Sequence, residues 1–175
     1  MTELAPAQGE RTTGRDDTGI APIHHWIDGA TVAGTSGRTS PVFNPATGRQ
    51  SGAVDLASVE EVDRAVQSAR LAFASWRSVS LARRADLLFR IRELVHQNKQ
   101  EIAKLLVAEH GKVLSDAMGE VTRGLEVIEF ACGIPTLLKG EFSEQASTGV
   151  DVYSIRQPVG VVAGITPFNF PAMVP

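Results

Sequence analysis

The chain has 175 residues, of which 43% are hydrophobic and 6% aromatic, and its formal net charge is −3. This length is enough for one globular domain with an aliphatic core, and the nearly neutral charge gives no reason to expect a nucleic-acid or membrane partner. No apolar run reaches the roughly 18 residues of a membrane span, and the first residues lack the apolar centre of a secretory signal. A lone cysteine, Cys132, excludes an internal disulfide, so we expect a cytoplasmic protein.

The first 57 residues divide into a tail and a strand region. Residues 1–22 are rich in Gly, Thr and Asp without periodicity, which predicts a disordered tail. From residue 23 the chain should form one domain that runs to residue 175 and is incomplete at its C-terminus. Its opening part, residues 23–57, holds short β-like pieces separated by turn-forming dipeptides: Asp28-Gly29, Asn44-Pro45 and Thr47-Gly48.

From residue 58 to about 138 the hydrophobic periodicity is helical. Ser58 followed by Glu61 has the spacing of a capping box, so the first helix should begin there. A second helix is expected to open near Ser80. Asn98 with Glu101 predicts a further capping box.

The third predicted helix follows Gly111, which is typical of a helix C-terminal stop. Its apolar residues recur every three or four positions: Leu114, Met118, Val121, Leu125, Ile128 and Cys132. Pro135 and Gly140 should close it. The sequence thus predicts a layer of three helices.

Strand character returns near the end of the chain. The segment DVYSIRQ (151–157) alternates as a half-buried strand does. The run VGVVAGI (159–165) is continuously apolar, which is typical of a strand covered on both faces of a parallel sheet. The predicted fold class is therefore α/β, with short N-terminal strands, a three-helix layer and the start of a parallel sheet.

Several residues that suggest a functional role are more simply structural. The four histidines share no metal-ligand spacing and one cysteine cannot complete a zinc site, so we predict no metal site. The glycines of GVVAG do not have the spacing of a dinucleotide-binding fingerprint. Cys132 falls on the apolar stripe of the third helix, where burial would leave its thiol unreactive, so we interpret it as a core residue.

Arg123 allows two interpretations. It lies off the apolar stripe, three residues from both Glu120 and Glu126, and the residues alone favour a surface ion pair. The alternative is a clamp on a substrate carboxylate, because a guanidinium can hold a carboxylate with two parallel hydrogen bonds. Gly124 beside it would let a neighbouring backbone or ligand come close.

Asn169 lies in a constrained stretch, TPFNFP (166–171). If residues 159–165 form a sheet strand, this stretch follows the strand's carboxyl end, where ligands bind in open α/β sheets. The two prolines restrict the backbone on both sides of Asn169. Its side chain is expected to cap a helix entered through Pro171 or to donate its NH₂ into a pocket, and the two roles are compatible.

The stretch PVGVVAGITPFNFPAMVP resembles the segment that opens the coenzyme domain in the aldehyde dehydrogenase superfamily. Most members have tryptophan at the position of Phe168. The phenylalanine, together with EVTRGLEVIEFACG and VYSIRQPVG, resembles the CoA-acylating methylmalonate-semialdehyde dehydrogenase branch. The resemblance also includes WIDG, FNPATG, FASW and AEHGK, and it extends from Trp26 to Pro175.

The resemblance implies roles for four residues. Asn169 matches the family's catalytic oxyanion-hole asparagine, and Arg123 matches an arginine implicated in holding the substrate's carboxylate. Thr166 and Phe168 match positions that line the NAD site. The implied reaction is the NAD-dependent oxidation of malonate or methylmalonate semialdehyde with CoA, giving acetyl-CoA or propionyl-CoA and carbon dioxide. The family also implies a homo-oligomer, a homotetramer, for the full-length protein.

The family's catalytic cysteine and much of its NAD site lie downstream of this motif and are absent from the sequence. Cys132 does not match the catalytic position. We therefore expect an N-terminal segment that is inactive alone. Two other interpretations stay open: a segment of a hydrolysing NAD(P)-dependent aldehyde dehydrogenase, and a non-catalytic helical interaction module. The buried-strand character of residues 159–165 argues against the module.

Overall fold

The computed structural model describes residues 19–175, so most of the predicted tail at 1–22 lies outside the described residues. The described chain forms two compact units that divide between Arg70 and Leu71. The division falls within α1 (Val59–Trp76). No helix of the described part is long and apolar enough to cross a membrane.

The first unit contains a small mixed sheet. Its central strand, β5 (Gln50–Asp55), pairs in parallel with β1 (Ala21–Ile23) and antiparallel with β4 (Thr39–Phe43). Strands β2 (His25–Ile27) and β3 (Ala30–Val32) form a separate hairpin. The predicted strand region is therefore confirmed, and it begins at Ala21, before the expected boundary at residue 23.

Helix α1 begins at the predicted capping box. The backbone N–H of Glu61 donates to Ser58 Oγ (3.2 Å), and the N–H of Ser58 donates to Glu61 Oε2 (2.7 Å). The other carboxylate oxygen of Glu61 accepts the N–H of Thr35 at 2.7 Å. The Glu61 side chain is 1% exposed, and the hydrogen bonds from Ser58 and Thr35 lower its pKa to about 2. This carboxylate ties the helix start to the loop that follows β3.

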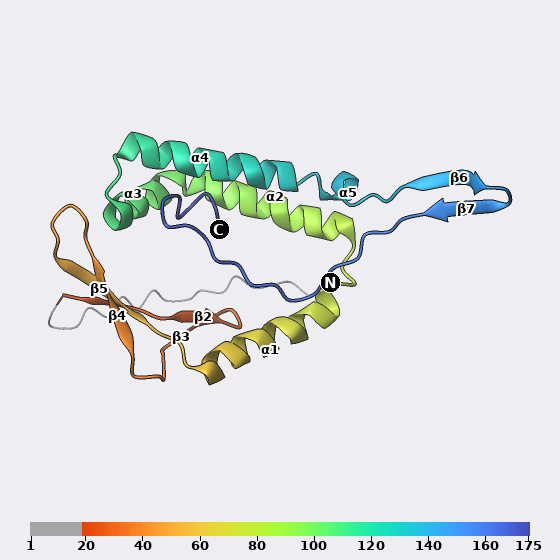
Figure 1. Cartoon of the computed structure of the whole chain (residues 1–175). Coiled ribbons are helices and arrows are strands. Elements are labelled where there is room, and N and C mark those ends of the chain that lie inside the picture. The colour runs from red at the N-terminus through yellow and green to blue at the C-terminus, as the bar shows by residue number, and fades with distance from the viewer. Residues whose placement is uncertain (1–18) are drawn as a thin grey trace, which may run out of the picture. The chain divides into compact units, whose positions relative to one another are not determined.

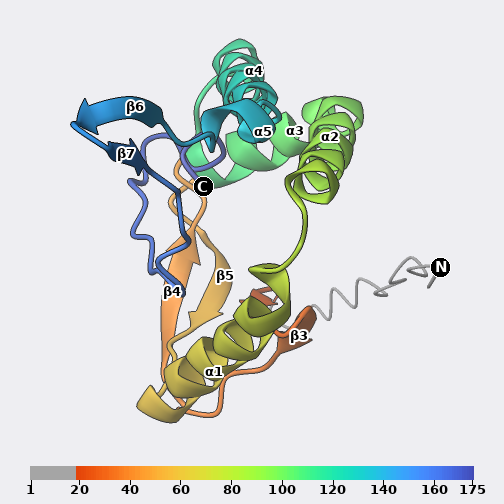
Figure 2. The same cartoon turned by 90° about the vertical axis from the view of Figure 1, so that its right-hand side faces the viewer.

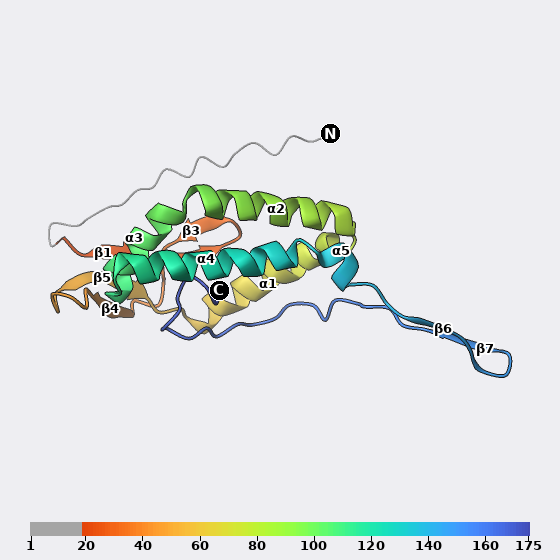
Figure 3. The same ribbon diagram turned by 90° about the horizontal axis from the view of Figure 1, so that it is seen from above.

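In the second unit three helices pack together: α2 (Leu81–Gln97), α3 (Lys99–His110) and α4 (Leu114–Ala131). Helices α2 and α4 lie side by side in all three views of the chain (Figures 1, 2 and 3). The short helix α5 (Ile134–Leu137) follows α4 and packs against α2.

The core of the second unit lies between α3 and α4. Ala103 and Ala117 are fully buried, and Leu106 and Val121 complete the cluster. Because the distance between two helices depends on the side chains at their contact, the alanines let α3 and α4 approach closely. Cys132 is buried at the end of the same stripe, which confirms its interpretation as a core residue.

The starts of α1 and α2 and the end of α3 agree with the sequence prediction, whereas α4 ends at Ala131, before the predicted stop at Pro135 and Gly140. Ser80 caps α2 by accepting the N–H of Arg83, and Gly111 ends α3 in the left-handed conformation with φ of 81°. The predicted capping box at Asn98 is wrong, because its side-chain amide donates back to the carbonyl of Leu94 at 2.8 Å. The chain does start α3 there, so the region predicted as three helices contains four long helices and α5.

Strands β6 (Phe142–Ser147) and β7 (Val150–Tyr153) form an antiparallel hairpin that extends beyond the helices of its unit (Figure 1). The sequence predicted a half-buried strand at 151–157 and no partner before it. Every residue of β7 is instead exposed, because no second layer packs on the hairpin within the described chain.

The predicted buried strand at 159–165 does not form. Val159, Val162 and Ile165 are 92%, 74% and 101% exposed, and the segment pairs with no strand among residues 19–175. A strand forms only where a neighbouring strand takes its backbone hydrogen bonds, and the described residues place none beside this segment. The α/β class is confirmed, with the sheet of the first unit as its main strand layer.

We expect Glu61→Gln to make the free energy of unfolding less dependent on pH in the acidic range. A carboxyl group whose pKa is lowered by folding stabilises the fold above its unfolded pKa, near 4.5, and this contribution is lost as the pH falls toward the folded value of about 2. Urea unfolding at several pH values from about 7 to 2 should show the difference in stability between the original chain and the variant shrinking across this window. A difference that stays constant with pH would contradict this role for Glu61.

Candidate functional site

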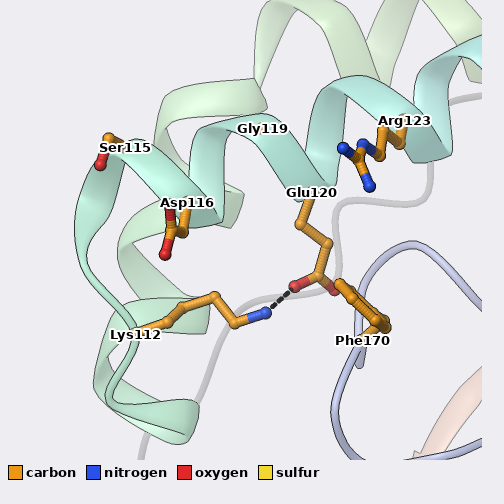
Figure 4. Close-up of a pocket in the computed structure, with 7 residues that line it drawn as sticks. All are labelled: Lys112, Ser115, Asp116, Gly119, Glu120, Arg123 and Phe170. Carbon is orange, nitrogen blue, oxygen red and sulfur yellow. Dashed lines mark hydrogen bonds and ion pairs between the residues drawn. The ribbon is translucent and has the colours of Figure 1, made fainter.

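The candidate site is a cavity of about 290 Å³ in the second unit (Figure 4). Its lining comes from the loop before α4, from one face of α4 and from the TPFNFP stretch. On α4 the lining positions recur every three or four residues, so they share one face of the helix. The lining residues are Lys112, Ser115, Asp116, Gly119, Glu120, Arg123 and Phe170.

Lys112 and Glu120 form a buried ion pair at this cavity. Lys112 Nζ donates to Glu120 Oε2 at 2.5 Å, and the two side chains are 13% and 1% exposed. Burial by itself would raise the pKa of Glu120. Hydrogen bonds from Lys112 and from the backbone N–H groups of Ala172 and Met173 outweigh burial and hold this pKa below its ordinary value. Glu120 is therefore a carboxylate at neutral pH.

The same ion pair holds the turn around Asn169. Glu120 Oε1 accepts the N–H of Ala172 at 2.8 Å and that of Met173 at 3.2 Å. Lys112 Nζ donates to the backbone carbonyl of Asn169 at 3.2 Å and lies 4.9 Å from the centre of the Phe170 ring. Lys112, in the loop before α4, and Glu120, on α4, thus contact the turn at four points.

Asn169 does not cap a helix, although the sequence allowed this role. A residue that caps a helix start accepts the N–H two or three residues later, which here would include that of Ala172. Glu120 already accepts this N–H, and the structure forms no helix after Pro171. The side-chain amide of Asn169 makes no hydrogen bond to any residue in 19–175 and is exposed, so both its donors are available.

Arg123 lies on the cavity wall with its guanidinium on the side of α4 that carries Glu120 (Figure 4). The surface ion pair that the residues alone favoured does not form, because Glu120 is taken by Lys112 and Arg123 pairs with no acid in the described part of the chain. The guanidinium donors of Arg123 are therefore free to meet a ligand.

Gly124 allows the turn to come close to α4, as the sequence suggested. A Cβ atom at Gly124 would lie 3.3 Å from Met173 Cα. At Gly119, five residues earlier, a Cβ would meet nothing within 4 Å. Close packing therefore favours glycine at position 124, whereas at position 119 it does not.

The predicted cofactor-contacting residues lie apart from this cavity. Thr166 and Phe168 are exposed, Phe168 by 89%, and neither lines the cavity that contains Arg123. Of the TPFNFP stretch only Phe170 contributes to its wall. The structure thus brings the backbone of Asn169 into contact with Lys112, which lines the same cavity as Arg123, and it leaves Thr166 and Phe168 open to solvent.

Sequence reasoning missed the roles of Lys112 and Glu120. Glu120 was considered only as a partner of Arg123, and Lys112 only as part of the AEHGK motif. A signal was nevertheless present, because Glu120 lies between Ala117 and Val121 on the buried face of α4. An acid at a core position is almost never left unpaired, so this placement indicates a buried cation nearby.

We expect Gly119→Ala to raise the thermal stability and Gly124→Ala not to do so. Alanine favours a helix over glycine by about 1 kcal/mol, and at position 119 its methyl group has open space. At position 124 the methyl group would press on Met173 and offset this gain. Thermal unfolding followed by circular dichroism measures both variants. An equal rise in Tm for the two would show that the turn does not lie against α4 as described.

Comparisons with known proteins place these residues in a family. Residues 31–175 match the sequence model of the aldehyde dehydrogenase family. The chain is 50% identical over 156 residues to the malonate-semialdehyde dehydrogenase of Pseudomonas aeruginosa, covering 89% of this chain and 31% of that protein. It is 50% identical over 153 residues to malonate-semialdehyde dehydrogenase 2 of Geobacillus thermodenitrificans, covering 87% of this chain and 32% of that protein.

Solved structures agree with the sequence matches. A protein of Sinorhizobium meliloti 1021 assigned as a methylmalonate-semialdehyde dehydrogenase, solved in complex with NAD, superposes with a TM-score of 0.84 at 52% identity, covering 88% of this chain and 31% of that chain. The methylmalonate-semialdehyde dehydrogenase of Oceanimonas doudoroffii superposes with a TM-score of 0.83 at 49% identity, covering 87% of this chain and 31% of that chain.

The chain therefore spans about a third of the length of the relatives that it matches. The prediction of the N-terminal part of an aldehyde-dehydrogenase-like fold is confirmed by these matches. Since the family match covers most of its residues, the chain belongs to the aldehyde dehydrogenase family.

Proposed function

We propose that these residues serve an enzyme that oxidises malonate or methylmalonate semialdehyde with NAD and CoA, giving acetyl-CoA or propionyl-CoA and carbon dioxide. The names of relatives at about 50% identity support this substrate class, and a structural neighbour solved with NAD supports the cofactor. The observation that carries the proposal is the cavity lined by an unpaired Arg123, by Phe170 and by Lys112, which holds the backbone of Asn169.

In this proposal Arg123 binds the carboxylate that distinguishes these substrates from uncharged aldehydes. A guanidinium without an acidic partner can hold a carboxylate by two parallel hydrogen bonds. Glu120, the acid three residues before Arg123 on α4, is paired with Lys112 and does not compete. Asp116, two turns earlier on α4, repels anions, so the substrate carboxylate should bind at the Arg123 end of the cavity.

Asn169 is the proposed oxyanion donor. When a cysteine thiolate adds to the aldehyde carbon, negative charge develops on the carbonyl oxygen, and an amide NH₂ held near that oxygen stabilises it. The Asn169 amide can take this role because Glu120, and not Asn169, accepts the N–H groups of the turn. Cys132 cannot supply the thiolate, since it is buried at the end of α4.

Thr166 and Phe168 are the proposed NAD contacts. Both side chains are exposed, and Thr166 makes no hydrogen bond within residues 19–175, so both are open to a cofactor. NAD supplies the hydride acceptor that the oxidation needs. The CoA co-substrate and the homotetramer belong to the same proposal and rest on the family resemblance alone. The proposed cytoplasmic location rests on the lone cysteine and on the composition of the sequence.

A chimera tests the proposal. The 175-residue chain replaces the matching third of the Pseudomonas aeruginosa malonate-semialdehyde dehydrogenase, whose remaining residues complete the polypeptide. With malonate semialdehyde and CoA the chimera should reduce NAD⁺ and release a thioester, whereas the 175-residue chain alone should give no turnover. Turnover by the chain alone would contradict the proposal. Release of a free acid at the same rate without CoA would favour a hydrolysing aldehyde dehydrogenase.

In the chimera we expect Arg123→Ala to raise the KM for malonate semialdehyde by about 10- to 100-fold, because hydrogen bonds to a charged group contribute about 1.5–3 kcal/mol. The KM for propanal, which has no carboxylate, should not change. Arg90→Ala provides a matched control, since Arg90 is an exposed arginine of α2 that does not line the cavity. An unchanged KM for malonate semialdehyde in Arg123→Ala would remove the carboxylate-binding role.

A further inference from the structure

The turn after Asn169 is capped by a residue from another element. The N–H of Val174 donates to the carbonyl of Phe170 at 3.2 Å, which is the hydrogen bond of a single helical turn. The first N–H groups of such a turn have no partner within it. Glu120, which precedes this turn by about fifty residues, accepts those of Ala172 and Met173.

This arrangement separates two tasks that Asn169 would otherwise combine. A local cap would engage the side-chain oxygen of Asn169 and turn the amide toward its own backbone. Because Glu120 accepts these N–H groups, the Asn169 side chain does not have to accept them. Lys112 meanwhile holds the backbone carbonyl of Asn169 at 3.2 Å, so the residue is fixed by its main chain while its amide stays free.

The two charges of the pair stabilise each other beside the turn. Glu120 is buried beside the core alanine Ala117 and Val121, where an unpaired carboxylate would be strongly unfavourable. Lys112 supplies the compensating charge and also packs its ammonium group over the Phe170 ring. The ion pair therefore stabilises both side chains that contact the turn.

We propose that Lys112 and Glu120 are positioning residues that present the Asn169 amide to the reacting carbonyl oxygen. Glu120 acts through the N–H groups that follow Asn169, and Lys112 acts through its carbonyl. This inference rests on the proposed function for the reaction, and it adds the contacts that hold the donor in place. A displacement of about 1 Å in a catalytic group can lower a rate by about 100-fold, so the pair should control kcat.

Two substitutions at position 120 distinguish an effect of losing the hydrogen-bond acceptor that positions Asn169 from an effect of losing the negative charge. In the chimera Glu120→Ala removes the acceptor of both N–H groups, and we expect kcat to fall by about 100-fold. Glu120→Gln keeps an oxygen acceptor of the same reach and should recover most of this loss. The KM values for NAD⁺ and for malonate semialdehyde should change by less than about threefold, because the lost interaction acts in the transition state.

An exposed ion pair on α3 provides the matched control. Lys104 Nζ lies 2.7 Å from Glu101 Oε1, and these side chains are 55% and 68% exposed. Glu101→Ala therefore removes an ion pair of similar length that contacts neither the turn nor the cavity. It should leave kcat and the KM values unchanged.

Hydrogen exchange in the 175-residue chain reports on the contacts directly. The backbone N–H groups of Ala172 and Met173 should exchange faster in Glu120→Ala than in the original chain, and at the original rate in Glu101→Ala. If Glu120→Ala does not fold, the double variant Lys112→Met with Glu120→Gln replaces it, since it removes both charges and leaves no buried ion unpaired. Its kcat in the chimera should then fall at least about tenfold because Lys112 no longer holds Asn169.

Asn169→Ala distinguishes a failure of this inference from a failure of the proposed function. The variant should lower kcat of the chimera by about 100- to 1000-fold, the usual effect of losing an oxyanion donor. If it does so while Glu120→Ala and the double variant keep full kcat, the positioning role is overturned and the proposed function stands. If Asn169→Ala keeps full kcat, the oxyanion role in the proposed function is overturned and the positioning proposal falls with it.

Discussion

A carboxylate buried in the face of a helix organises the second unit of this chain. Glu120 lies in the apolar stripe of α4, where it is 3% exposed, and it is tolerated there because Lys112 and two backbone N–H groups satisfy it. The helical core, the loop before α4 and the turn at the end of the chain thus depend on one another. Any change that leaves Glu120 without these donors disturbs all three.

Helix α4 combines three tasks at a spacing set by its geometry. Val121 packs in the core, Glu120 holds the turn, and Arg123 faces the cavity. Two residues three apart on a helix are neighbours, so Glu120 and Arg123 would pair on an isolated helix. Glu120 instead forms its ion pair with Lys112, which leaves Arg123 free for an anionic ligand.

In the first unit Glu61 is also a buried carboxylate that accepts backbone N–H groups. There a carboxylate buried by its surroundings accepts the N–H groups of Ser58 and Thr35, which lowers its pKa to about 2. Both acids stabilise backbone that lies outside regular secondary structure. They differ in their countercharge, since Glu120 bonds directly to a lysine whereas Arg64 Nη2 lies 3.8 Å from Glu61 Oε1.

The sequence by itself determined the helix starts at Ser58 and Ser80 and the stop at Gly111, because the hydrogen bonds at these points join residues three or four apart. It also identified the family, since the motifs that carry the resemblance are short and contiguous. Only the tertiary structure decided that Glu120 pairs with Lys112 and caps the turn of Asn169. Those partners lie eight to fifty-three residues away, beyond the reach of any local pattern. The run at 159–165 was mispredicted for the same reason, because a strand depends on a neighbour from elsewhere in the chain.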